Sequence, residues 1–106
     1  MTQPVSASPT TTVVVASNAV FRALADPTRR AILALLRDGP MTSGAIADRF
    51  PVAWATISRH LGILRGADLV LSTRDGNAIT YELNTTVFQE FVDHVLGWLN
   101  TGGSNA

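Results

Sequence analysis

The segment VAWATISRHLGILRGADLV, residues 52–70, concentrates hydrogen-bond donors near its beginning. Four such side chains lie close together there with no acidic residue among them: Thr56, Ser58, Arg59 and His60. Hydroxyl groups and guanidinium groups bind phosphate oxygens and base edges, and arginine can donate two parallel hydrogen bonds to guanine in the major groove. The segment therefore points first to recognition of a polyanion.

The sequence contains few residues that could support metal binding, cofactor binding or catalysis. The chain has no cysteine, which excludes disulfides, thiolate metal sites and cysteine nucleophiles. Its two histidines are His60 and His94, and no glycine-rich phosphate loop or set of nucleophile, base and orienting residue is recognisable. Asp93 and His94 are adjacent rather than at helical ligand spacing. We predict no metal site, no cofactor and no enzyme activity.

The donors fall in a predicted helix over residues 54–66. Successive residues lie about 100° apart around a helix, so Ile57, Leu61 and Leu64 form one apolar face while Ser58 and Arg59 point away from it. A DNA contact surface is predicted on this helix, at the start of the preceding helix and on a following hairpin. Its members are Ser43, Trp54, Ala55, Thr56, Ser58, Arg59, His60, Arg65, Arg74 and Asn77.

Two members of this surface have a second interpretation. His60 lies toward the core flank of the helix, so a packed, hydrogen-bonded histidine competes with a phosphate contact. Trp54 either contacts the groove or forms an apolar lid over the start of the helix. Arg59 is the first choice for sequence specificity.

Three shorter helices are predicted before residue 54. Ser17 is expected to cap the first, which runs to about residue 25, and Asp26-Pro27 opens the second, which ends before Gly39-Pro40. The third is predicted from Thr42 or Ser43 to Phe50. Two short helices separated by a turn, the second bearing the donors, match a helix-turn-helix arrangement.

The hydrophobic period changes after Gly66 from helical to alternating. Residues 69–73 and 78–83 flank Arg74-Asp75-Gly76-Asn77, and Asp-Gly between two β-prone runs is typical of a hairpin. We predict a two-stranded wing. The fold class is therefore mainly α with a β-hairpin wing (α+β), a winged helix-turn-helix with about five helices.

A last helix follows the wing. Asn84, Thr85 or Thr86 is expected to cap it, with Gln89 completing a capping box with Thr86. Its apolar residues cover more than one buried face, and such a surplus marks an interface. We predict that it pairs two copies of the chain together with the first helix, through Val20, Phe21, Leu24, Phe88, Phe91, Val92, Val95 and Leu99.

Charge is divided between the two halves of the chain. The net charge is zero, but residues 17–66 hold seven arginines and three aspartates, whereas residues 67–106 hold one arginine and five acids. The basic half is expected to meet DNA and the acidic half to pair protomers. Residues 1–16 are predicted to be a flexible tail, residues 17–101 one domain and residues 102–106 a flexible end. No signal peptide or membrane span is recognisable, so a cytoplasmic protein is expected.

Three motifs in this order resemble the ArsR/SmtB family of bacterial winged-helix repressors. They are ALADPTRRAILALL over residues 23–36, TISRHLGIL over residues 56–64 and ADLV before the hairpin. The resemblance covers residues 20–99 and is nearest to the SdpR-like branch, which lacks the cysteine metal motif. It implies a homodimer that binds a palindromic DNA operator and releases it on a signal. The effector is not identified by the sequence.

The chain departs from the family pattern at three places. Metal sensors of the family carry Cys-x-Cys in the third helix, where this chain has SGAIA at residues 43–47. Asp68 replaces the usual glycine before the wing and must adopt a left-handed conformation. After the wing turn Asn77 replaces basic residues, so phosphate contact there depends on Arg74. A winged-helix module that binds proteins without contacting DNA is the alternative function.

Overall fold

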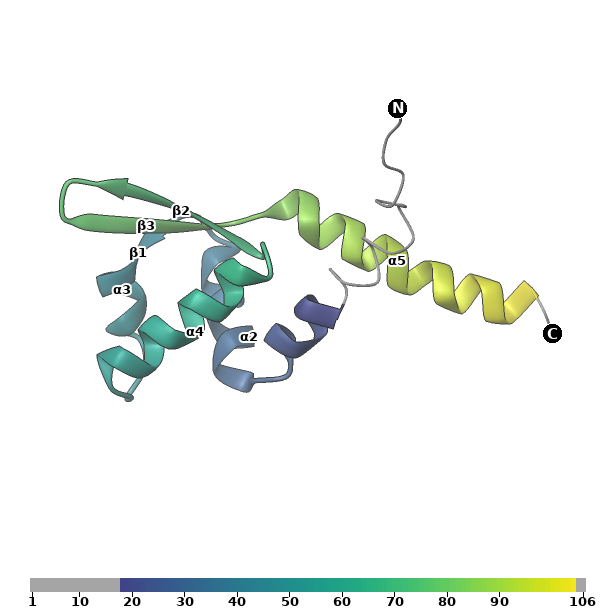
Figure 1. The fold of residues 1–106 in the computed structure, drawn as a ribbon, viewed down its shortest axis with the longest axis horizontal. Helices are drawn as coiled ribbons and strands as arrows, with labels where there is room; N and C mark the ends of the chain where they lie inside the picture. The colour runs from purple at the N-terminus through teal and green to yellow at the C-terminus, as the bar shows by residue number, and fades with distance from the viewer. Residues whose placement is uncertain (1–17, 105–106) are drawn as a thin grey trace, which may run out of the picture.

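The computed structural model describes residues 18–104, which form five helices and one three-stranded antiparallel sheet (Figure 1). The predicted tail and the predicted Ser17 cap lie outside the described residues. In chain order the elements are a helix over residues 18–24, α2 (Pro27–Leu36), β1 (Met41–Thr42), α3 (Ser43–Ala47), α4 (Trp54–Gly66), β2 (Val70–Asp75), β3 (Ala78–Leu83) and α5 (Thr85–Ser104).

Helix α2 begins as the sequence predicts. The Asp26 carboxylate accepts a hydrogen bond from the backbone N–H of Arg29 at 3.0 Å, and Pro27 occupies the first turn, where its missing N–H costs nothing. Three apolar residues on one face, Ile32, Leu33 and Leu36, are buried. α2 is thereby anchored under the sheet and against α4.

The helix-turn-helix consists of α3 and α4. α3 is shorter than predicted, because residues 48–50 form a turn instead of continuing to Phe50. Thr42 caps it by accepting a hydrogen bond from the Ala45 N–H at 3.1 Å. The apolar face predicted for α4 is confirmed, since Ile57, Leu61 and Leu64 are each at most 1% exposed.

One hydrophobic core joins these elements. It draws on every described element except the short β1 and α5, whose apolar residues pack against it at its edge. Its members are Val20, Ala23, Ile32, Leu33, Leu36, Ile46, Ile57, Leu61, Leu64, Ala67, Leu69, Val70 and Tyr81.

The end of α4 forms a Schellman motif. The Leu69 N–H bonds the Leu64 carbonyl at 3.1 Å, and the Asp68 N–H bonds the Arg65 carbonyl at 2.9 Å. Asp68 occupies the left-handed position of this motif with φ of 60°, as the sequence predicts. The motif turns the chain directly from α4 into the hairpin.

The predicted two-stranded wing, β2 and β3, is confirmed, and a third strand that the sequence did not predict, β1, extends it to a sheet of order β1-β3-β2. β1 pairs with β3 through Met41 opposite Tyr81 and Thr42 opposite Thr80. A strand of two residues is too short to produce an alternating pattern in the sequence. The hairpin itself is confirmed: Asp75 pairs with Ala78, which leaves a two-residue turn, and Gly76 adopts φ of 64° there.

α5 begins with a different cap from the predicted box. The Asn84 side chain accepts from the Val87 N–H at 3.4 Å, whereas Gln89 donates to Asp93 at 2.9 Å instead of reaching back to Thr86. The helix continues to Ser104, past the predicted boundary at residue 101. Its C-terminal half extends beyond the body formed by the other helices (Figure 1).

Asp68 provides a test of the α4 terminus. Asp68→Gly should raise the free energy of unfolding by up to about 1 kcal/mol, because glycine tolerates the left-handed conformation without a Cβ clash. Urea denaturation measures the change. Asp68→Asn removes the carboxylate from the negative end of the helix but keeps the Cβ, so it separates charge from conformation. A Gly variant less stable than the Asn variant would contradict this account.

Candidate nucleic-acid interface

One side of α4 is a solvent-exposed row of donors. Trp54 is 56% exposed, and Ala55, Thr56, Ser58, Arg59 and Arg65 are exposed as well. No carboxylate lies within ion-pair distance of Arg59 or Arg65 in the described part of the chain. Both guanidinium groups therefore keep their donors free for a ligand in solvent.

The start of α4 adds backbone donors to this row. Its N-cap is Ala53, which has no side-chain acceptor, and no acidic residue lies in the first turn. The N–H groups of Trp54 and Ala55 precede the first intrahelical bonds, which run from Thr56 and Ile57 to the Ala53 carbonyl. Unpaired N–H groups at the positive end of a helix favour phosphate binding.

The other predicted contacts lie on α3 and on the wing. Ser43 is half-buried, and Arg74 and Asn77 are exposed beside the hairpin turn. Along the longest axis of the molecule, the wing tip and the α3–α4 turn lie at the same end, opposite the C-terminal half of α5 (Figure 1). The wing tip and the start of α4 therefore lie at one end, whereas Arg65 is in the last turn of α4, at the other end of that helix.

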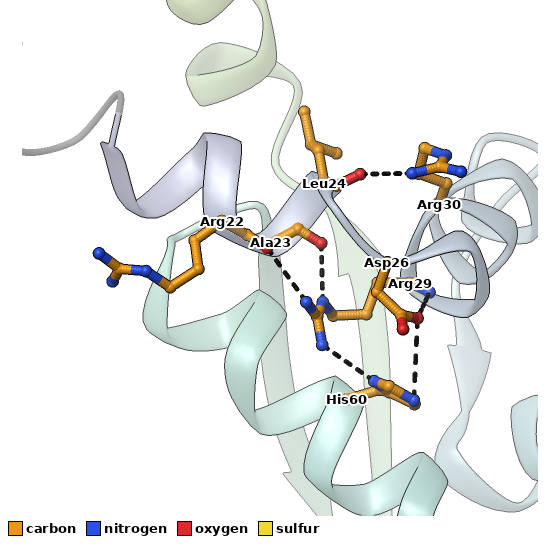
Figure 2. Close-up of polar contacts among 7 residues, drawn as sticks. All are labelled: Arg22, Ala23, Leu24, Asp26, Arg29, Arg30 and His60. Carbon is orange, nitrogen blue, oxygen red and sulfur yellow. Dashed lines mark hydrogen bonds and ion pairs between the residues drawn. The ribbon is translucent and has the colours of Figure 1, made fainter.

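His60 is a correction to the predicted surface. It is 8% exposed and faces α2, so the packed role is the one observed. Figure 2 shows its ring between the Arg29 guanidinium, with Nη1 3.2 Å from the His60 Nδ1, and the Asp26 carboxylate, 3.9 Å from Nε2. Because a guanidinium only donates, Nδ1 accepts, which assigns the proton of a neutral ring to Nε2 on the Asp26 side.

Arg29 holds three elements together. Its Nε donates to the Ala23 carbonyl at 2.7 Å and its Nη2 to the Arg22 carbonyl at 3.1 Å, while Nη1 contacts His60 (Figure 2). The carbonyls lie in the last turn of the helix over residues 18–24, where the Arg22 carbonyl also accepts from the Ala25 N–H at 3.3 Å. We name Asp26, Arg29 and His60 the anchor cluster. It fixes α4 relative to α2 and to the first helix.

The carboxylate of the anchor cluster is held in its charged form. The hydrogen bond from the Arg29 backbone N–H lowers the pKa of Asp26 below its ordinary value of 3.8 against the opposing effect of desolvation, and the positive charge of Arg29 acts in the same direction as the hydrogen bond. The cluster was only partly predicted from the sequence, which indicated Asp26 at the start of the second helix but no contact of Arg29 with His60. Residues 29 and 60 are 31 positions apart in the sequence, and no sequence pattern indicates that their side chains are in contact.

The predicted dimer residues divide into three groups by exposure. Val20 is 1% exposed and belongs to the protomer core, so it is unavailable to a partner and that prediction was wrong. Leu24, Phe88, Phe91 and Val95 are half-buried, whereas Phe21, Val92 and Leu99 are 43%, 43% and 67% exposed.

An apolar stripe on α5 remains uncovered in the protomer. It consists of Val92, Leu96 and Leu99, which follow the helical spacing of i, i+4 and i+7. Leu96 and Trp98 are each 49% exposed and were missed as interface candidates. The Trp98 ring stacks on Phe21 with 5.7 Å between centroids, which extends the exposed apolar surface across the first helix.

Comparison with known proteins identifies the type of domain. A family described as a helix-turn-helix domain matches residues 24–73. The transcriptional repressor SdpR of Bacillus subtilis is 46% identical over 88 residues, which are 83% of this chain and 98% of that protein. The chain belongs to the ArsR/SmtB family of winged helix-turn-helix transcriptional regulators.

Further ArsR/SmtB relatives agree with this assignment. The arsenical resistance operon repressor of Staphylococcus xylosus is 32% identical over 76 residues, covering 72% of this chain and 69% of that protein. An ArsR-like transcriptional regulator from Rhodococcus sp. RHA1 superposes with a TM-score of 0.75 at 27% identity, covering 87% of this chain and 86% of that one. The chain is thus a DNA-binding transcriptional regulator and not an enzyme.

The described residues of this ArsR/SmtB chain contain neither a metal-ligand cluster nor a membrane-spanning helix. Residues 43–47 read SGAIA, and across residues 18–104 no three His, Cys, Asp or Glu side chains are grouped as a metal site would need. No helix in that range is both long and apolar enough to cross a membrane.

Replacing the Arg29 guanidinium by an ammonium group tests whether the anchor cluster stabilises the fold. Arg29→Lys should lower the free energy of unfolding by about 1–3 kcal/mol, because one ammonium group cannot reach both carbonyls and His60 as the guanidinium fork does. Urea denaturation measures the loss. Arg30→Lys is the matched control, since the Arg30 guanidinium donates to a single carbonyl among the described residues, that of Leu24, and its effect should be smaller. Equal losses in the two variants would argue against the cluster as the anchor of α4.

Proposed function

We propose that the chain represses transcription by binding a palindromic DNA operator as a homodimer, with α4 in the major groove. The observation that carries this proposal is the division of α4 into two faces. Ile57, Leu61 and Leu64 are fully buried, and the opposite face exposes donors without acidic neighbours. Such a helix is held rigidly while its donors remain accessible to base edges.

Each exposed group of α4 suits a different part of the duplex. Arg59 can bind the O6 and N7 atoms of guanine, and this pair discriminates against other bases by about 1–3 kcal/mol. The backbone N–H groups of Trp54 and Ala55 suit phosphate oxygens, which position the protein without reading sequence. Arg74 on the wing suits phosphate in the same way. The predicted cytoplasmic location fits access to DNA.

The homodimer places two copies of α4 on one face of the duplex. Successive major grooves on that face lie roughly 34 Å apart, so a twofold axis must relate the two helices across that distance. The apolar stripe on α5 and the exposed Phe21 provide the surface for pairing, and the C-terminal half of α5 lies at the end of the molecule opposite the wing tip (Figure 1). A palindromic operator follows from this symmetry.

Arg59→Ala tests the contact with guanine. It should weaken binding to an operator found by footprinting by about 1–3 kcal/mol and relax base preference at one position in each half-site. Fluorescence anisotropy with the operator and single-base variants measures both effects. Arg37→Ala removes an exposed arginine from α2 and serves as the matched control, with affinity expected to stay unchanged. Retained affinity in the Arg59 variant would remove this residue from the reading surface.

Leu99→Glu tests the pairing surface. The charge would have to be buried without a partner in the apolar seam, so the variant should sediment as a monomer at concentrations where the wild type is a dimer. Thr86→Glu adds the same charge to an exposed position of α5 outside the stripe, and this control should remain a dimer. An intact dimer in the Leu99 variant would exclude the C-terminal part of the stripe from the interface.

A further inference from the structure

A groove of about 490 Å³ runs between α2 and the start of α5, away from the reading face of α4. Its volume lies within the range of about 300–1,000 Å³ that is typical of small-molecule sites. Leu33, Ala34 and Arg37 are among the residues lining one wall, and Phe88 and Val92 are among those lining the other. The proposed contacts with DNA do not involve the residues that line this groove.

The floor and the rim of the groove differ in chemistry. The floor is apolar, with Leu33 6% exposed and Leu24 and Phe88 half-buried beside it. The charged residues that line the groove are Arg30 and Arg37, and no acidic residue is among its lining residues. The groove therefore combines an apolar surface with positive charge.

The two arginines form one edge of the groove. Arg37 is the C-cap of α2 and follows Arg30 by seven residues, which places both on the same helix face about 10 Å from each other. Arg30 donates from Nη1 to the Leu24 carbonyl at 2.7 Å, which holds its guanidinium beside the groove (Figure 2). Neither arginine is within ion-pair distance of a carboxylate among the described residues. An anion entering the groove would find the Arg37 guanidinium and the remaining donors of the Arg30 guanidinium available.

We propose that this groove binds a small amphipathic carboxylate, with its apolar body on Leu24, Leu33 and Phe88 and its carboxylate on Arg30 or Arg37. A carboxylate matches the guanidinium fork with two parallel hydrogen bonds, and these charge-assisted bonds are the stronger class. The apolar part gains by leaving water for the exposed floor. An uncharged apolar molecule would satisfy the floor but leave the arginines without a partner.

A second copy of the chain is the competing occupant, because Leu24, Phe88 and Val92 also belong to the predicted dimer surface. A partner's α5 would cover the arginines mainly with its apolar stripe, and only its two acidic residues, at positions 90 and 93, could pair with them; burying charges that stay unpaired is costly. A free carboxylate pairs them instead. The inference concerns binding in the absence of DNA, so it is independent of the proposed operator contact.

The test uses decanoate, titrated below its critical micelle concentration into the full chain and followed by calorimetry. Saturable binding of one molecule per chain is expected, and 1-decanol should bind about tenfold more weakly because it cannot pair with the arginines. Absence of decanoate binding to the wild type overturns the proposal. Equal affinity for decanol also overturns it, since the groove would then be an apolar surface alone.

Variants locate the site. Ala34→Phe should abolish decanoate binding, because this exposed residue lines the groove and the added ring fills it. The double variant Arg30→Gln, Arg37→Gln keeps the shape and should weaken binding about tenfold. Arg65→Gln, an exposed arginine on α4 outside the groove, is the control and should bind as the wild type does. Wild-type affinity in both groove variants would place decanoate elsewhere and overturn the assignment.

Sedimentation of the same Ala34→Phe protein separates the two occupants. A dimer that no longer binds decanoate supports the ligand site. A monomer would show that a second copy occupies the groove, and this outcome also overturns the proposal. Circular dichroism melting of each variant confirms that the comparison is between folded proteins.

Discussion

The rotation of α4 about its own axis is the constraint on which the structure depends. A helix that reads DNA must present donors to solvent and still be immobile, and both demands fall on thirteen residues. Burial of Ile57, Leu61 and Leu64 at 1%, 1% and 0% exposure allows only one rotation. A rotation by one residue, about 100°, would move Arg59 toward the core and bring apolar groups to the surface.

Burial of an apolar face fixes the rotation of a helix more firmly than its position along the axis, and the anchor cluster supplies the second constraint. Arg29 reaches the carbonyls at the end of the first helix and the ring of His60 with a single planar group. A shift of α4 along its axis would separate the His60 Nδ1 from its donor in a site shielded from water, where an unpaired polar group is costly. The cluster thus relates the reading helix to the elements proposed for pairing.

Local rules in the sequence were sufficient for much of the fold. The Asp26 cap, the apolar face of α4, the left-handed Asp68 and the hairpin turn at Gly76 each follow from a few neighbouring residues, and all were predicted correctly. The failures depend on distant contacts. β1 exists because β3 lies beside it, and two residues cannot show a period. His60 and Val20 were assigned to surfaces because helical geometry gives a direction without saying which neighbour lies there.

The residue Thr42 belongs to two elements at once, which has a consequence for engineering. Its backbone lies opposite Thr80 in the sheet, and its hydroxyl caps α3. The base of the hairpin is therefore continuous with the helical reading unit, and removing the hairpin as a whole would also unravel the start of α3. The tip is different, since Arg74 to Asn77 lies beyond the last pairing with β1. New specificities are thus better grafted by exchanging these four residues than by exchanging the entire loop region between family members.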